Sequence, residues 1–169
     1  MNSNFQNEPF FNIGSGRSGT TMLRLMLNDH PRIRVPRETA FLPKLMDRLP
    51  LNSPLSEDDK RLAFDLISNH FKWEAWAVTP ERLGDTISSL KHPLLGQMID
   101  AIYHNCSNPE SKPRWGDKTI VCTKEVERVH RVFPNAKFIH IIRDARDVCI
   151  SFRQAYLRDP NNPAWRTNG

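Results

Sequence analysis

Residues 14–21, with the sequence Gly-Ser-Gly-Arg-Ser-Gly-Thr-Thr, combine glycines, hydroxyl side chains and one arginine in a single short loop. The glycine spacing is that of a P-loop, in which consecutive backbone N–H groups converge on an anion. A helix that begins near Gly19 would add the positive end of its dipole, and Arg17 would add a formal charge. The loop therefore predicts a site for a phosphate or sulfate group. Further hydrogen-bond donors come from Ser18, Thr20 and Thr21.

The loop lacks the lysine of P-loop kinases and ATPases, because Thr20 occupies that position. No clear acidic ligand for magnesium follows it. Both observations argue against ATP with magnesium as the ligand. An ordinary glycine-rich turn is the alternative, and the Arg-Ser-Gly-Thr-Thr run between a strand and a helix makes that alternative the weaker one.

A second anion site is predicted near the end of the chain. Arg143 follows the apolar residues 138–142, and Ser151 follows eight residues later on a helix that Asp144 can cap. An arginine at a strand end and a serine two turns into the next helix can reach one phosphate together, at the sheet edge where open α/β folds bind ligands. The alternative is a surface salt bridge from Arg143 to Asp144 or Asp147, with Ser151 in solvent.

The two segments together resemble the sulfotransferases that use 3′-phosphoadenosine 5′-phosphosulfate. Residues 16–21 are similar to the family's 5′-phosphosulfate loop, whose core is a basic residue followed by Ser-Gly-Thr-Thr. Residues 138–152 are similar to its 3′-phosphate motif, in which an arginine ends a strand and a serine follows eight residues later. The pattern is nearest to the bacterial and tyrosylprotein-type members, and it covers the N-terminal portion of their domain.

The resemblance implies both a cofactor and the residues that hold it. The cofactor is 3′-phosphoadenosine 5′-phosphosulfate, and the product is adenosine 3′,5′-bisphosphate. The residues implied for the 3′-phosphate are Arg143 and Ser151. The residues implied for the 5′-phosphosulfate are Arg17, Ser18, Gly19, Thr20 and Thr21.

Sulfuryl transfer needs a base for the acceptor's proton and positive charge for the equatorial and leaving oxygens. Glu38 lies about as far beyond the loop as the catalytic glutamate of tyrosylprotein sulfotransferases, so the resemblance makes it the base. Lys118, which follows Asp117, resembles the lysine that the family places near the sulfuryl group, and Arg17 completes the catalytic set. The alternatives are a surface pair of Glu38 with Arg37, and a solvated Lys118.

The predicted reaction transfers a sulfuryl group to a hydroxyl or phenol of a small-molecule, carbohydrate or peptide acceptor. Tyrosylprotein sulfotransferases carry another arginine one helical turn after the serine, and Ala155 occupies that position here. This departure argues against tyrosine as the acceptor. Two alternatives stay open, a non-catalytic remnant that binds nucleotide and, less favoured, a P-loop kinase.

An α/β fold with a P-loop-like parallel sheet flanked by helices must position these residues. Strands are predicted over residues 10–13, 33–35 and 137–142. Residues 1–169 form a single, partial domain in this interpretation, cut short at the C-terminus.

Helices are predicted between the strands from capping residues and apolar spacing. Residues 22–27 predict a mostly buried helix after the loop. Helix starts are expected at Ser56, at Thr79 with proline next to it, after Pro93 and at Thr123.

The composition of the chain limits the kinds of ligand and partner that the sequence predicts. The net charge is +5, but the arginines neither form one block nor interleave with aromatic residues, so no nucleic-acid site is predicted. Six histidines and three cysteines show no metal-ligand spacing, and no metal is expected. No apolar run approaches the about 18 residues of a membrane span, and no signal peptide is evident, which predicts a cytoplasmic protein. Trp73, Trp76 and His140 are expected in the core, and the thiols are expected to be buried or inert.

Overall fold

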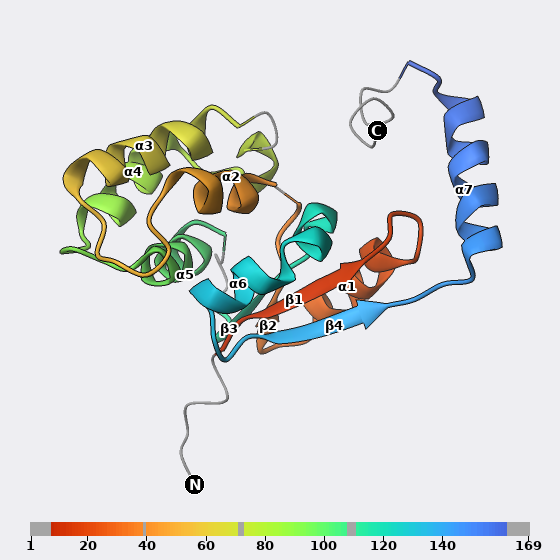
Figure 1. Ribbon diagram of the computed structural model, residues 1–169, viewed down its shortest axis with the longest axis horizontal. Helices are drawn as coiled ribbons and strands as arrows, with labels where there is room; N and C mark the ends of the chain where they lie inside the picture. Colours follow the sequence, from red (N-terminus) through yellow and green to blue (C-terminus); the bar gives the residue numbers. More distant parts are fainter. Residues whose placement is uncertain (1–7, 39, 71–72, 108–110, 162–169) are drawn as a thin grey trace, which may run out of the picture.

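The computed structural model describes residues 8–38, 40–70, 73–107 and 111–161. Within these residues the centre is a sheet of four parallel strands in the order β2-β3-β1-β4 (Figure 1). Phe10 pairs with Gly116 on one side and with Lys137 on the other. The predicted α/β class with a parallel sheet is confirmed. The strands are β1 (Phe10–Gly14), β2 (Ile33–Arg34), β3 (Arg114–Asp117) and β4 (Lys137–Ile141).

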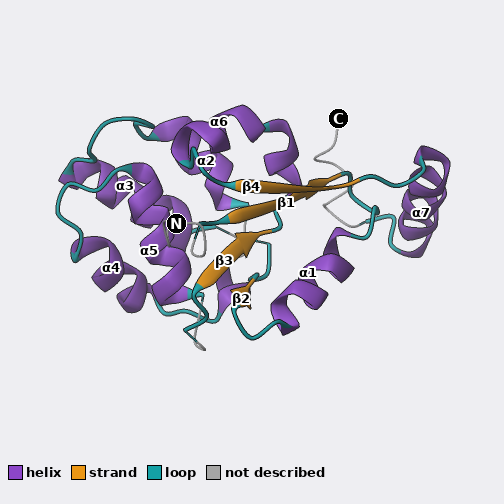
Figure 2. Cartoon of the chain, turned by 90° about the horizontal axis from the view of Figure 1, so that it is seen from below, coloured by secondary structure: helices purple, strands orange, loops and turns teal. Residues whose placement is uncertain are grey.

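The helices of the described chain lie on both sides of this sheet. They are α1 (Thr20–Asp29), α2 (Phe41–Arg48), α3 (Glu57–Ser68), α4 (Pro80–Ser88), α5 (Leu95–Cys106), α6 (Val126–Val132) and α7 (Ala145–Arg158), with the 3₁₀ helices η2 (Trp73–Trp76) and η3 (Ile120–Lys124). In Figure 2, α1 lies on one side of the strands, and α2 and α6 lie on the other. Figure 1 shows α2 to α5 grouped at one end, while α7 stands at the opposite end beyond β4. Within the described residues, no helix is both long and apolar enough to cross a membrane.

Three predicted helix starts are confirmed by their caps. Ser56 begins α3 with a capping box, in which Ser56 Oγ accepts from the N–H of Asp59 and the Asp59 carboxylate accepts from the N–H of Ser56. Thr79 Oγ1 accepts from the N–H of Arg82 ahead of α4, and the helix after Pro93 is α5. The fourth start is wrong, because Thr123 lies inside η3 and α6 begins only at Val126.

Aromatic rings form the centre of the core. The Trp115 ring is completely buried and stacks on Tyr103 at 4.0 Å between ring centroids. Phe11 of β1 meets Trp115 of β3 edge-on at 6.0 Å. The stacking of Trp115 on Tyr103 of α5 joins the sheet to the helical end of the molecule. Trp73 and Trp76 are buried in the same cluster, as predicted.

Two elements, β3 and α2, were not predicted from the sequence. Residues 114–117 carry a single large apolar side chain, Trp115, and no alternating pattern, yet they pair with β1 and β2 on either side. In α2, Pro43 lies in the first turn, where its missing N–H costs no hydrogen bond.

The predicted burial of the first helix is wrong. Only Thr20 of α1 is buried, and Met22, Leu25 and Met26 are between 54% and 66% exposed. These three side chains share one face of the helix because they lie three and four residues apart. The helix packs mainly on β1 and β2, and its apolar face points away from them.

The predicted burial of His140 is also wrong, whereas two of the three thiols are buried, as predicted. His140 is exposed, because β4 is an edge strand of the described sheet, paired only with β1. The thiols of Cys106 and Cys122 are buried, and burial raises the pKa of both. Cys149, in contrast, lies exposed on α7.

Candidate functional site

The loop between β1 and α1 has the backbone that its glycines predict. Gly14 ends β1 with φ at +151°, and a Cβ there would lie 2.7 Å from the carbonyl oxygen of Ile141. Gly19 has φ at +98°, and nothing would lie within 4 Å of a Cβ on its outer side. Both positions therefore favour glycine. The space beside Gly19 leaves the loop open to an incoming anion at the start of α1.

The two predicted anion sites meet in the structure. Arg17 Nε donates a hydrogen bond to Ser151 Oγ at 3.0 Å, and Arg143 Nη1 donates to the backbone oxygen of Arg17 at 3.1 Å. Arg17 is separated from Arg143 by 126 residues and from Ser151 by 134 residues. The loop after β1 and the segment from the end of β4 into α7 thus lie together, and Arg17 contacts both Ser151 and Arg143.

The alternative roles of Arg143 and its neighbours are visible too. Arg143 Nε lies 3.6 Å from the Asp147 carboxylate, with both side chains about half exposed. An exposed pair of this kind stabilises a protein by only about 0–1 kcal/mol, so a phosphate can displace it. Asp144 caps α7 by accepting from the N–H of Arg146, and its carboxylate pairs with the Arg146 side chain.

Glu38 and Lys118 form the second part of the site. Lys118 Nζ donates to Glu38 Oε2 at 3.1 Å, and the N–H of Ile120 donates to Glu38 Oε1 at 3.2 Å. Lys118 is buried, with only 6% of the residue exposed. The predicted alternative of a solvated Lys118 is therefore wrong, and Glu38 is paired with a buried lysine. Because water is largely excluded, the charges interact more strongly here than they would on an open surface.

Asp117 is the last residue of β3 and directly precedes Lys118 in the chain. It is buried, and its Oδ2 accepts from Tyr103 Oη at 2.6 Å and from Thr119 Oγ1 at 3.1 Å. Burial raises the pKa of Asp117, although the hydrogen bonds from Tyr103 and Thr119 oppose that shift. The carboxyl group is thus held by hydroxyl donors from α5 and from its own strand end, next to Lys118 in the chain.

A pH dependence of stability follows from Asp117. Its raised folded-state pKa means that the folded protein keeps this proton at pH values where the unfolded chain, with a pKa of about 3.9, releases it. The stabilisation is fully present below that pH and is lost as the pH rises through the folded-state value. Asp117→Asn resembles the protonated carboxyl, so we expect the free energy of unfolding of the variant, relative to wild type, to increase with pH.

Urea unfolding between pH 4 and pH 7 measures this difference. Asp29→Asn, at an exposed position of α1, is the control, and its stability should follow that of wild type. Parallel pH profiles for wild type and Asp117→Asn would show that Asp117 is ionised in the folded protein.

Two site contacts were missed from the sequence. Thr123 of η3 hydrogen-bonds to Gly14, and Tyr103 of α5 hydrogen-bonds to Asp117. Both are single hydroxyls far from their partners in the chain, and neither belongs to a recognisable motif. Only the spatial order of the elements reveals them.

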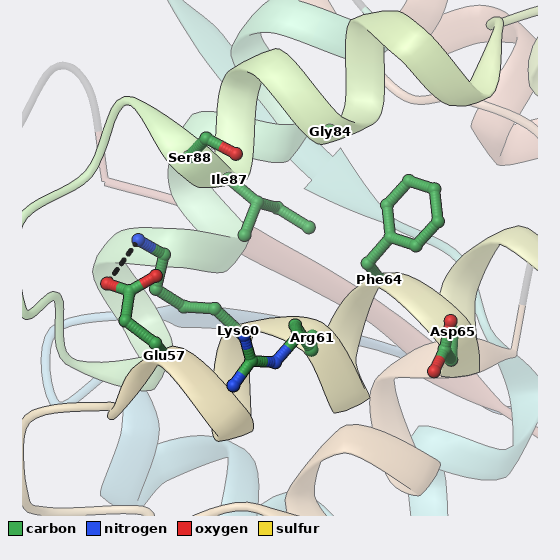
Figure 3. Close-up of a pocket in the computed structure, with 8 residues that line it drawn as sticks. All are labelled: Glu57, Lys60, Arg61, Phe64, Asp65, Gly84, Ile87 and Ser88. Atoms are coloured by element: carbon green, nitrogen blue, oxygen red, sulfur yellow. Dashed lines mark hydrogen bonds and ion pairs between the residues drawn. The ribbon is translucent and has the colours of Figure 1, made fainter.

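A cleft between α3 and α4 lies apart from this site (Figure 3). Lys60, on its wall, is buried but already donates to Glu57 at 2.9 Å and to the carbonyl oxygen of Leu90 at 3.0 Å. The charge of Lys60 is therefore satisfied by groups of the protein itself. Among the described residues, no cluster of three histidine, cysteine or acidic side chains is arranged to hold a metal ion.

The residues around the loop suit a nucleotide with two separate anionic groups. The open backbone at Gly19 and the buried hydroxyls of Ser18 and Thr20 fit one tetrahedral anion. Arg143 and Ser151 fit a second anion next to it, since guanidinium and hydroxyl groups are the usual donors to phosphate. The donor set therefore fits 3′-phosphoadenosine 5′-phosphosulfate.

Comparison with known proteins identifies the family. The family model described as "Sulfotransferase family" matches residues 9–168. Protein-tyrosine sulfotransferase A of Caenorhabditis elegans is 30% identical over 139 residues, which cover 82% of this chain and 31% of that protein. Protein-tyrosine sulfotransferase 1 of Rattus norvegicus is 30% identical over 142 residues, which cover 83% and 33%. The chain thus spans about a third of the length of these curated relatives.

A solved structure supports the fold. The sulfotransferase domain from the Synechococcus PCC 7002 olefin synthase superposes with a TM-score of 0.52 at 23% identity, covering 89% of this chain and 54% of that one. The family model matches nearly all of the chain, and this agrees with the order of the two predicted anion-binding segments and with their contact in space. The chain belongs to the sulfotransferase family.

Proposed function

We propose that the protein transfers a sulfuryl group from 3′-phosphoadenosine 5′-phosphosulfate to a hydroxyl or phenol acceptor. The observation that carries this proposal is the contact of Arg17 with both Ser151 and Arg143. A loop for one anion and a strand-to-helix turn for another meet at the carboxyl edge of the parallel sheet, which suits a nucleotide phosphorylated at both ends of its ribose. The family match supports the same reaction.

In this proposal the 3′-phosphate lies against Arg143 and Ser151, and Arg17 faces both groups. When bound, the cofactor supplies an activated sulfuryl group on a phosphate that can leave. Arginine suits this position because its planar fork donates to two oxygens at once. The residues that hold the 5′-phosphosulfate are Arg17, Ser18, Gly19, Thr20 and Thr21.

Glu38 takes the proton of the acceptor hydroxyl as the acceptor oxygen forms its bond to sulfur. Lys118, within hydrogen-bond distance of Glu38, would stabilise the negative charge that develops on the oxygen whose bond to sulfur breaks. Arg17 would add positive charge from the loop side. The product that leaves with the electron pair would be adenosine 3′,5′-bisphosphate.

The names of the relatives bear on the acceptor. Both rat and nematode relatives are named protein-tyrosine sulfotransferases, which supports a hydroxyl of a peptide or protein. Ala155, on α7, stands where the resemblance to tyrosylprotein sulfotransferases leads us to expect an arginine, and this departure argues against extending tyrosine specificity to this chain. Small-molecule and carbohydrate acceptors therefore stay within the proposal. A cytoplasmic location stays a prediction.

Arg143→Ala should weaken the preference for nucleotides with a 3′-phosphate. Losing one charge-assisted contact to phosphate costs about 1.5–3 kcal/mol, which is about a 10- to 150-fold rise in the dissociation constant. Calorimetry with adenosine 3′,5′-bisphosphate and with AMP measures the preference, and Arg158→Ala, at the exposed end of α7, is the control. An unchanged preference in Arg143→Ala would show that Arg143 serves only its ion pair with Asp147.

A transfer assay tests the proposed function itself. Purified protein is incubated with radiolabelled 3′-phosphoadenosine 5′-phosphosulfate and a panel of peptide, phenol and carbohydrate hydroxyls, without magnesium. Labelled acceptor supports the proposal. Nucleotide binding without transfer would identify a non-catalytic remnant, and phosphoryl transfer from ATP with magnesium would identify a kinase.

A further inference from the structure

The segment after β3 makes contacts at both of its ends that no motif predicted. At its start, the N–H of Ile120 and the Nζ of Lys118 hold the two carboxylate oxygens of Glu38 at 3.2 Å and 3.1 Å. Since Glu38 follows β2 in the chain, these bonds tie the end of β3 to the segment after β2. The carboxylate is therefore fixed in orientation as well as in position.

At its other end, η3 holds the base of the phosphate loop through one hydroxyl. Thr123 Oγ1 accepts from the N–H of Gly14 at 3.0 Å and donates to the carbonyl oxygen of Gly14 at 3.2 Å. A threonine hydroxyl can do both at once, because it has one donor and two acceptor sites. Both backbone groups of the last residue of β1 are thus satisfied by a single side chain.

Gly14 is a sensitive place for such a contact. It is the residue at which the chain leaves β1 and enters the loop, and its conformation leaves no room for a Cβ against Ile141. Ile120 also lies close to the loop, since a Cβ added to Gly16 would be 3.7 Å from Ile120 Cδ1. The segment 118–123 therefore makes two hydrogen bonds to the start of the loop and two to Glu38.

We propose that Thr123 is a positioning residue for sulfuryl transfer, which holds the phosphate loop in register with Glu38 and Lys118. This inference rests on the proposed function. Transfer requires the acceptor, which Glu38 orients, to line up with the sulfuryl group, which the loop orients. Ile120, which bonds to Glu38, and Thr123, which bonds to Gly14, belong to the same short 3₁₀ helix, η3. The alignment of Glu38 with the loop therefore does not depend on the more distant helices. A displacement of about 1 Å between such groups can lower a rate about 100-fold.

Three variants of the full chain test the inference. Thr123→Val keeps the shape but removes both hydrogen bonds to Gly14, and Thr123→Ser restores the hydroxyl. Thr86→Val is the matched control, because Thr86, like Thr123, donates its hydroxyl to a backbone carbonyl, in this case that of Arg82 on α4. The measurements are kcat and KM for the acceptor, hydrogen exchange at the amide of Gly14, and the melting temperature.

We expect Thr123→Val to lower kcat by about 10- to 100-fold with little change in KM, and to speed exchange at Gly14. Thr123→Ser should recover most of the wild-type kcat, and Thr86→Val should lower the melting temperature without lowering kcat. If Thr123→Val exchanges faster at Gly14 but turns over like Thr86→Val, Thr123 is only structural and the inference is overturned. A wild type that transfers no sulfuryl group overturns the proposed function, and the inference with it.

Discussion

Replacing Glu38 with glutamine is expected to lower turnover by about 10²–10⁴-fold, the contribution of a general base. Glutamine keeps the size of the side chain and can still accept from the N–H of Ile120 through its amide oxygen. It cannot take a proton from the acceptor. The contacts of Glu38 described above are with Lys118 and Ile120, and neither is predicted to bind a phosphate. Affinity for adenosine 3′,5′-bisphosphate should therefore stay nearly the same. Turnover and calorimetric affinity are measured in parallel.

Glu127→Gln is the control for this experiment, since Glu127 lies exposed on α6 and pairs only with Arg131 among the described contacts. Its turnover should equal that of wild type. If Glu38→Gln turns over normally, the base lies elsewhere. If it loses nucleotide binding together with turnover, the Glu38–Lys118 pair is a structural part of the loop and not the base.

Replacing Trp115 with alanine is expected to cost about 3–5 kcal/mol of the free energy of unfolding, the range for large aromatic truncations in a core. Trp115 is completely buried and stacks on Tyr103, and its Nε1 donates to Asp100 at 2.7 Å. The substitution leaves a cavity beside Phe11 and leaves the Asp100 carboxylate without this donor. Urea unfolding measures the loss.

Trp115→Phe separates packing from the hydrogen bond. Phenylalanine keeps a ring against Tyr103 but loses the donor to Asp100, so its loss should be clearly smaller than that of the alanine variant. A loss below about 1 kcal/mol in Trp115→Ala would mean that the core closes around the cavity, and that Trp115 is not its centre.

The elements that the sequence predicted best are those whose ends are marked by capping residues or glycines within the element's own segment. Gly14 to Thr21 mark the end of a strand and the start of a helix, and Ser56 and Thr79 cap helices through local bonds. The strand β3 was missed because it owes its existence to neighbours on both sides. Gly116 of β3 has no side chain, and this leaves room for the ring of Phe10. A Cβ at position 116 would lie 2.3 Å from that ring.

Periodicity identified α1 as a helix but not what covers it. Met22, Leu25 and Met26 have the spacing of a buried face and are nevertheless exposed on the described chain. The same holds for His140, whose strand is apolar enough for a core position but lies at the edge of the sheet. A pattern reports which residues share a face, whereas burial depends on the partner of that face.

The candidate site likewise has one part that the sequence predicts and one part that it does not. Arg17, Arg143 and Ser151 could be predicted as neighbours, because each follows a strand of a parallel sheet and such strand ends share one edge. The bond from the N–H of Ile120 to Glu38 could not, since it depends on the path of a short 3₁₀ helix. Thr123 and Tyr103 carried no signal in the sequence.

The most direct measurement of the central claim is a calorimetric titration of the wild-type chain with three nucleotides, adenosine 3′,5′-bisphosphate, AMP, and ATP with magnesium. The proposal places one anion site at the loop and an adjoining one at Arg143 and Ser151. The bisphosphate should therefore bind more tightly than either of the others, by at least about tenfold over AMP. Equal affinities for the bisphosphate and AMP, or a preference for ATP with magnesium, would contradict the assignment of the site to 3′-phosphoadenosine 5′-phosphosulfate.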